Sequence, residues 1–136
     1  MTSISERKIS ASVVLLGSLV LLRLPALAQS GITVTSLAQT SATDCTLSNA
    51  IKSANTAAAV GGCTFTGSGG PYTIQLQNQT YTMATVDNWW YGPNALPPIA
   101  SNIIIEGNGA TLAITDATIV RLRFFYVGAD PNANGS

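Results

Sequence analysis

The sequence CTLSNAIKSANTAAAVGGC, residues 45–63, is the one part of the chain after residue 28 with helical periodicity. Its apolar side chains recur at helical spacing, at Leu47, Ala50, Ile51 and Ala54. Asp44 or Thr46 is suited to cap the start, and Gly61-Gly62 stops the helix. The pattern therefore predicts one helix, over about residues 46–59.

Cys45 and Cys63 bracket this predicted helix. In an exported chain thiols tend to oxidise, and a bond between these two cysteines would close a loop of 18 residues. Chain entropy values such a loop at about 3 kcal/mol. Two separate buried thiols are a weaker alternative, and zinc is weaker still because the chain has no histidine. We predict a disulfide, no metal site and no cofactor.

Short β-favouring runs separated by glycine, asparagine, threonine and proline make up the rest of the chain. Strands are expected over residues 31–35, 72–76, 81–83, 102–106, 110–114 and 119–127. Short strands with tight turns suit a sandwich, a barrel or a β-solenoid. The solenoid is favoured because Ile103-Ile104-Ile105 lacks strict alternation, as though both neighbours bury it. An amphipathic helix is also suited to cover the apolar end of a first coil.

The sequence CTLSNAI at 45–51, followed by GGC at 61–63, resembles the Cys-Ser/Thr-Leu-Arg-Glu-Ala-Ile motif. That motif marks the CSLREA region, which opens many bacterial secreted or surface proteins with right-handed parallel β-helices. IIIEGNGATL at 103–112 looks like a coil of the pectate-lyase-like superfamily. The family's Arg-Glu pair is Ser48-Asn49 here, which removes a capping acid. The resemblance covers roughly residues 32–127. It implies a mainly β fold: a capping helix and the first coils of a right-handed parallel β-helix, incomplete at its end.

The N-terminal segment 1–28 has the three parts of a secretory signal peptide. Arg7-Lys8 supply the positive start, residues 9–22 the apolar middle, and Ala26-Leu27-Ala28 the small-x-small pattern before the cleavage site. A transmembrane anchor is the alternative, but the apolar run is shorter than the roughly 20 residues that a spanning helix needs. Arg23 also closes it with a charge. We predict a bacterial protein that is secreted or held at the cell surface.

Removal of that segment would leave three basic and five acidic residues, a net charge of about −2. So sparse a charge provides no basic stripe for nucleic acid and no polybasic patch for a membrane surface. Nucleic acid is therefore not an expected partner, and no later segment is apolar enough to span a membrane. The remainder is predicted to be one domain, 29–127, and a flexible tail of turn-forming residues, 128–136.

Catalysis has few candidates in this chain. Without histidine, the Ser-His-Asp and Cys-His arrangements are excluded. The resemblance implies acidic residues, sometimes with calcium or a basic residue, as in β-helix polysaccharide enzymes. The side chains suited to such a cluster are Asp87, Glu106, Asp116, Arg121 and Arg123. No spacing forces them together, and separate solvated charges are the interpretation that we favour. We assign no catalytic residue.

Trp89, Trp90 and Tyr91 form the best candidate for a binding site. They lie in an irregular loop expected over residues 85–98, and flat aromatic faces stack on sugar rings. The alternative is that the loop folds back and buries these rings. Burial is the interpretation that we favour, because adjacent aromatic residues in so apolar a chain usually pack.

The leading functional hypothesis is a secreted or cell-surface structural or adhesive protein without its own catalytic site. We expect the chain to be the N-terminal fragment of a longer β-helix, since nothing after Phe124-Phe125-Tyr126 would cap its end. Self-association through that open end is a further expectation, and a carbohydrate or cell-surface component is the expected ligand. The alternatives are part of a pectate-lyase-like carbohydrate-active enzyme, or a small secreted sugar-binding module using the tryptophans.

Overall fold

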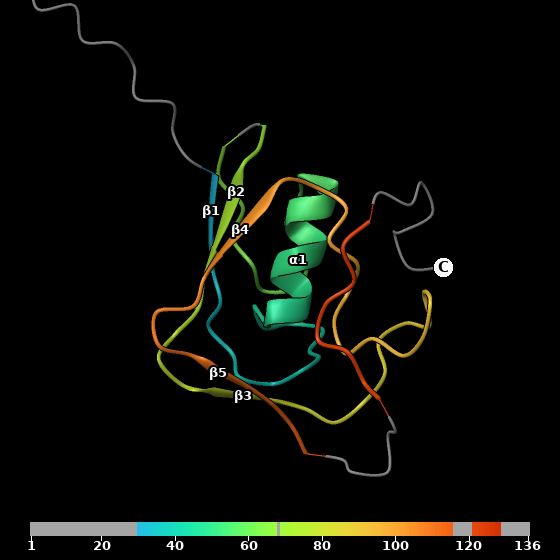
Figure 1. Ribbon diagram of the computed structural model, residues 1–136. Coiled ribbons are helices and arrows are strands. Elements are labelled where there is room, and N and C mark those ends of the chain that lie inside the picture. The colour runs from blue at the N-terminus through green and yellow to red at the C-terminus, as the bar shows by residue number, and fades with distance from the viewer. Residues whose placement is uncertain (1–29, 68, 116–120, 129–136) are drawn as a thin grey trace, which may run out of the picture.

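The structure, a computed structural model, describes residues 30–67, 69–115 and 121–128 (Figure 1). The predicted signal peptide and residues 129–136 of the predicted tail lie outside these ranges. The elements in chain order are β1 (Ser30–Thr33), α1 (Leu47–Thr56), β2 (Tyr72–Gln75), β3 (Thr80–Met83), β4 (Ile103–Glu106) and β5 (Thr111–Ile114). Within the described ranges, no helix combines the length and the apolar character that crossing a bilayer requires.

The five strands form two small parallel sheets. One sheet has the order β1-β2-β4, with Ile32, Ile74 and Ile105 in register across it. The other pairs β3 with β5, so that Tyr81 stands beside Leu112. Each of β2 and β4 leads through a short turn into the strand of the second sheet, and the two sheets diverge from these turns at an angle (Figure 1). The expected strands from 31 to 114 are therefore confirmed in position.

The right-handed parallel β-helix expected from the sequence is wrong for the described residues. They form two small sheets and one helix, and no solenoid is seen. Between β3 and β4 the chain makes only isolated bridges, and the expected strand over 119–127 has no regular strand in its described part. There Arg123 pairs only with Asn94, and Val127 only with Ile99.

Side-chain amides explain why the segment between β3 and β4 is not a strand. Gln39 donates from Nε2 to the carbonyls of Thr85 and Ala95, and its Oε1 accepts from the backbone N–H groups of Ala84 and Thr85. Asn55 on α1 likewise binds the segment around residues 98–101. Backbone groups bound in this way are not available to a neighbouring strand, and the prolines here have no N–H to donate.

Helix α1 begins as predicted and ends earlier. The Thr46 hydroxyl accepts from the Asn49 N–H at 3.1 Å, which confirms the cap. The helix ends at Thr56 because Ala57 adopts a left-handed conformation with φ 51°. Its N–H donates to the Ser53 carbonyl, as does the Ala58 N–H, and the Val60 N–H donates to the Ser53 hydroxyl. Three hydrogen bonds to one residue close the helix before the predicted Gly61-Gly62 stop.

The predicted disulfide is confirmed, with Cys45 bonded to Cys63. It ties the start of α1 to the chain that follows the helix, and both cysteines belong to the buried core. The helix contacts β1 and β2 and lies within the angle between the two sheets in the view of Figure 1. The largest core side chains come from the helix, from both sheets and from the segments that follow β1 and β3: Ile32, Val34, Leu47, Ile51, Ile74, Tyr81, Met83 and Leu96.

Asn108 fixes the turn between β4 and β5. Its φ of 49° is left-handed, a conformation that asparagine adopts more readily than most residues. The side-chain nitrogen donates to Gln75 Oε1 at 2.9 Å and to the Leu76 carbonyl at 3.1 Å. These bonds attach the turn between β4 and β5 to the turn between β2 and β3. They thereby help to fix the angle between β4 and β5.

Candidate functional site

The aromatic loop, residues 87–94, contains a tight turn that carries the predicted binding residues. The Gly92 N–H donates to the Trp89 carbonyl at 3.2 Å, which closes the turn. Within it Tyr91 has φ 54° and Gly92 has φ 122°. A left-handed backbone costs a residue with a bulky side chain about 1 kcal/mol or more. Strain of this kind at an exposed tyrosine is typical of a binding site.

Asn94 holds the aromatic loop from inside. It is fully buried, and its side-chain nitrogen lies 2.7 Å from Asn88 Oδ1, 2.9 Å from the Trp90 carbonyl and 3.1 Å from the Gly92 carbonyl. The base of the loop is closed by the backbone, since the Asn94 N–H donates to the Asn88 carbonyl at 2.8 Å. The polar backbone of the turn is therefore directed inward, onto one buried amide.

A second segment, residues 121–128, supports the same loop. Arg123 donates from Nη2 to the Trp90 carbonyl at 2.8 Å, and its backbone pairs with Pro93 and Ala95. Gly92 is required at its position because a Cβ there would lie 3.2 Å from this Nη2 in a left-handed backbone. The Tyr126 ring stacks on Tyr91, with centroids 5.5 Å apart and planes 25° apart.

Two of the three predicted aromatic residues are exposed. Trp89 is 72% exposed and Tyr91 is 80% exposed, whereas Trp90 is half-buried. The sequence favoured burial of all three rings, and the structure departs from that expectation. The reason is that Asn94 and Arg123 bind the carbonyl groups of the turn, which leaves the rings of Trp89 and Tyr91 on the outside.

The arrangement presents rigid aromatic surface to solvent. Large exposed aromatic groups on a monomer are characteristic of binding sites, and tryptophan, tyrosine and arginine contribute most to recognition. The stacked Tyr91–Tyr126 pair and the Trp89 ring offer flat faces, and the exposed Arg123 offers further N–H donors. Such an arrangement is suited to hold a flat ligand against the aromatic faces.

The carboxylates considered for catalysis are engaged by different parts of the chain. Asp87 accepts from Asn88 Nδ2 and lies 3.8 Å from the Lys52 ammonium. Glu106 accepts from the Gln75 side chain, and Asp116 lies outside the described residues. In the part of the chain that the structure describes, no group of three or more acidic or cysteine side chains is placed to hold a metal ion.

Asn94 and Tyr126 also belong to this site, although neither was among the residues predicted from the sequence. Asn94 follows Pro93 in a segment that predicts an irregular loop, and nothing local distinguishes a buried asparagine from an exposed one. Tyr126 lies more than thirty residues from its stacking partner, in a stretch that resembles a strand. The pairing of residues 93–95 with Arg123 is the tertiary contact that joins them.

The chain matches no model of a known protein family, no curated protein and no solved structure.

Proposed function

We propose that this protein is an exported structural or adhesive protein that binds carbohydrate through the aromatic loop. The observation that carries the proposal is the exposure of Trp89 and Tyr91 on a turn that Asn94 and Arg123 hold in place. Ordering a loop costs free energy on binding, and a loop already fixed by buried hydrogen bonds avoids most of that cost. Flat aromatic rings of this kind are suited to stack on the faces of pyranose rings.

The location is part of the same proposal. A disulfide between Cys45 and Cys63 is the state expected outside the reducing cytosol, and it supports export. The signal-peptide pattern in residues 1–28 points in the same direction. We also propose that the CTLSNAI sequence at 45–51 relates this chain to the CSLREA region of bacterial secreted and surface proteins. The capped helix and its disulfide are consistent with that relation.

Binding to insoluble polysaccharides tests the proposal. The full chain is mixed with cellulose, chitin and peptidoglycan, and the depletion of protein from solution is measured for the wild type and for Trp89→Ala. We expect at least one polysaccharide to retain the wild type, with affinity lowered at least tenfold in the variant. Leu37→Ala, which removes another exposed apolar side chain, serves as the control and should bind as the wild type does. Equal retention of all three proteins, or of none, would overturn the proposal.

Self-association is a second candidate property, and a separate observation favours it. Within the described residues, β4 and β5 each pair on one side only, and an apolar pocket lies beside β4. Open strand edges next to apolar surface are sites where a further chain adds strands. We propose that the protein associates with itself through this end, and an adhesive or structural protein would gain multivalency from doing so.

A further inference from the structure

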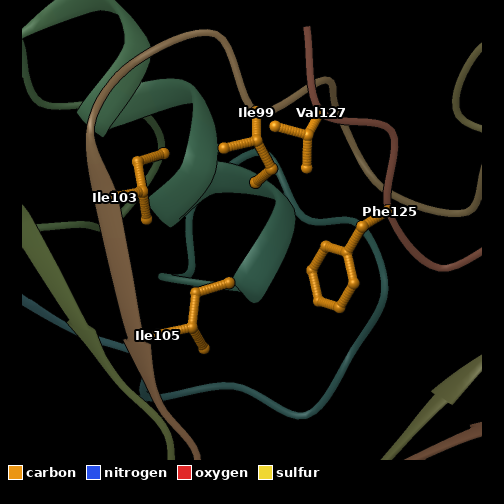
Figure 2. Close-up of a pocket in the computed structure, with 5 residues that line it drawn as sticks. All are labelled: Ile99, Ile103, Ile105, Phe125 and Val127. Atoms are coloured by element: carbon orange, nitrogen blue, oxygen red, sulfur yellow. The ribbon is translucent and has the colours of Figure 1, made fainter.

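One end of the fold, formed by β4, β5 and the neighbouring segments, exposes apolar side chains. A pocket of about 230 Å³ opens there. Figure 2 shows its lining, with two isoleucines of β4 facing a phenylalanine across the hollow; the lining residues are Ile99, Ile103, Ile105, Phe125 and Val127. On the other strand Ile114 pairs with the buried Met83, yet Ile114 is 40% exposed. Ile114 thus shares the face of a core residue, and the described residues leave it partly exposed.

Several backbone groups at this end have no partner among the residues that the structure describes. The carbonyls of Asn102 and Glu106 accept from β2 and its flanking residue, so the peptide groups of Ile103 and Ile105 point to the open edge. On β5 the N–H groups of Thr111 and Thr115 donate to the β3 side. The peptide groups of Leu112 and Ile114 therefore also point to an open edge.

A partner that covers this end must supply two strands. β4 runs toward the turn at residues 107–110 and β5 runs away from it, so the two open edges diverge from one turn at an angle (Figure 1). A single extended peptide would pair with one edge and leave the other edge and much of the pocket uncovered. A second copy of this chain presents two open edges at the same angle, and it therefore fits both at once.

We propose that two copies associate head to head through this end, with β4 of each copy antiparallel to β5 of the other. A twofold axis that passes beside the 107–110 turn and bisects the angle between the strands places β4 on the partner's β5. Because one strand runs toward the turn and the other away from it, the pairing is antiparallel in both sheets. Twofold contacts of this isologous kind are the commonest in homo-oligomers.

The strand register that follows from this axis agrees with both the direction of the peptide groups and the face of the side chains. Positions equidistant from the turn pair, so Ile103 faces Ile114 of the second copy and Ile105 faces Leu112. These are the four residues whose peptide groups point to the open edges, so they form the hydrogen-bonded pairs of an antiparallel ladder. Their side chains are also on one face: Ile103 and Ile105 line the pocket, and Leu112 and Ile114 stand beside the buried Tyr81 and Met83. A shift by one residue would break both matches.

Charge does not oppose this contact. Glu106 is the acidic residue of β4, and the register places it opposite Thr111 of the second copy rather than opposite another carboxylate. The described residues that line the pocket are all apolar. Like charges directly across a strand pair would destabilise it, and this register avoids them.

The inference rests on the proposed self-association and is independent of carbohydrate binding. It is tested by cysteine cross-linking of the full chain, in which Cys45 and Cys63 are already bonded to each other. The register puts Ile104 opposite Ala113 of the second copy in a non-hydrogen-bonded pair, whose Cα separation of about 4.5 Å permits a disulfide. The double variant Ile104→Cys/Ala113→Cys should form a covalent dimer on a non-reducing gel. Each single variant should show at most a tenth of that yield.

Sedimentation velocity tests the same contact without the double cysteine variant, which could fold poorly. Sedimentation velocity of the wild type and of Ile114→Lys should show the dimer dissociation constant raised at least tenfold by the lysine. Thr82→Lys, an exposed position on β3 outside the proposed contact, is the control. A wild type that sediments as a monomer would overturn both self-association and this inference. Efficient dimer formation by Ile104→Cys alone would mean that β4 pairs with β4. That result would overturn the register while leaving self-association intact.

Discussion

The side-chain nitrogen of Asn94 lies 2.9 Å from the carbonyl oxygen of Trp90, and this contact links the buried interior to the turn that carries the exposed aromatic rings. Asn94 is fully buried, whereas the rings on either side of Trp90 are largely in solvent. A buried amide that binds three oxygens of one turn leaves that turn few alternative conformations. The position of the exposed aromatic rings is therefore determined by the core.

Replacing Asn94 should destabilise the protein and disorder the aromatic loop. Asn94→Ala removes the buried amide that contacts three oxygens of the loop. The Gly92 carbonyl then loses its donor, while Arg123 still donates to the Trp90 carbonyl, and we expect the free energy of unfolding to fall by about 2–3 kcal/mol. The control is Asn78→Ala, an exposed asparagine, where a change below about 0.5 kcal/mol is expected. Urea unfolding followed by fluorescence measures both. Equal effects of the two substitutions would contradict the role assigned to Asn94.

Loss of the disulfide should lower the free energy of unfolding by more than the loss of a helix-capping hydrogen bond would. Cys45→Ala/Cys63→Ala removes a covalent link across 18 residues, and we expect the free energy of unfolding to fall by about 3 kcal/mol. Reduction of the wild-type protein should produce a loss of similar size, measured by thermal unfolding with and without reductant. A double variant as stable as the oxidised wild type would show that the link contributes nothing to the fold.

Tyr91 should be dispensable for stability and necessary for binding. Tyr91→Gly relieves a left-handed backbone, worth about 1 kcal/mol, and loses the ring contact with Tyr126, worth about 0.5–1.5 kcal/mol. The two effects nearly offset each other, so unfolding should change by less than about 1 kcal/mol. Carbohydrate affinity, measured by polysaccharide depletion, should fall at least tenfold. A loss of stability above about 2 kcal/mol would instead identify Tyr91 as a packing residue.

Local features of the fold could be predicted from the sequence because they depend on short-range patterns. The spacing of Leu47 and Ile51 located α1, and Thr46 marked its start. The end of α1 could not be predicted, because Ser53 closes it through contacts with residues 57–60 rather than through the glycine pair. The strands from residue 30 to residue 114 were also predicted, from two-residue alternation or, in β4, from an apolar run, whereas the strand expected over 119–127 was wrong in its described part.

Strand order and the shape of the site could not be predicted in the same way. The apolar run Ile103-Ile104-Ile105 marks β4 as a strand, but it does not show which segments will lie beside that strand. The β-helix expected from the resemblance failed because Gln39 and Asn55 bind the backbone between β3 and β4. The exposure of Trp89 likewise depends on Asn94. Asn94 is buried by residues far from it in the sequence, and a local pattern does not show such contacts.

Whether the aromatic loop binds carbohydrate is decided by the response of the two tryptophan indole N–H signals to a bound oligosaccharide. The chain has two tryptophans, so a nitrogen–proton spectrum resolves Trp89 and Trp90 as separate signals, assigned with Trp89→Phe. The probe is a soluble fragment of whichever of cellulose, chitin or peptidoglycan retains the protein. If the aromatic loop binds carbohydrate, the Trp89 signal should shift saturably and by more than the Trp90 signal. A Trp89 signal that stays fixed at saturating ligand would contradict this binding.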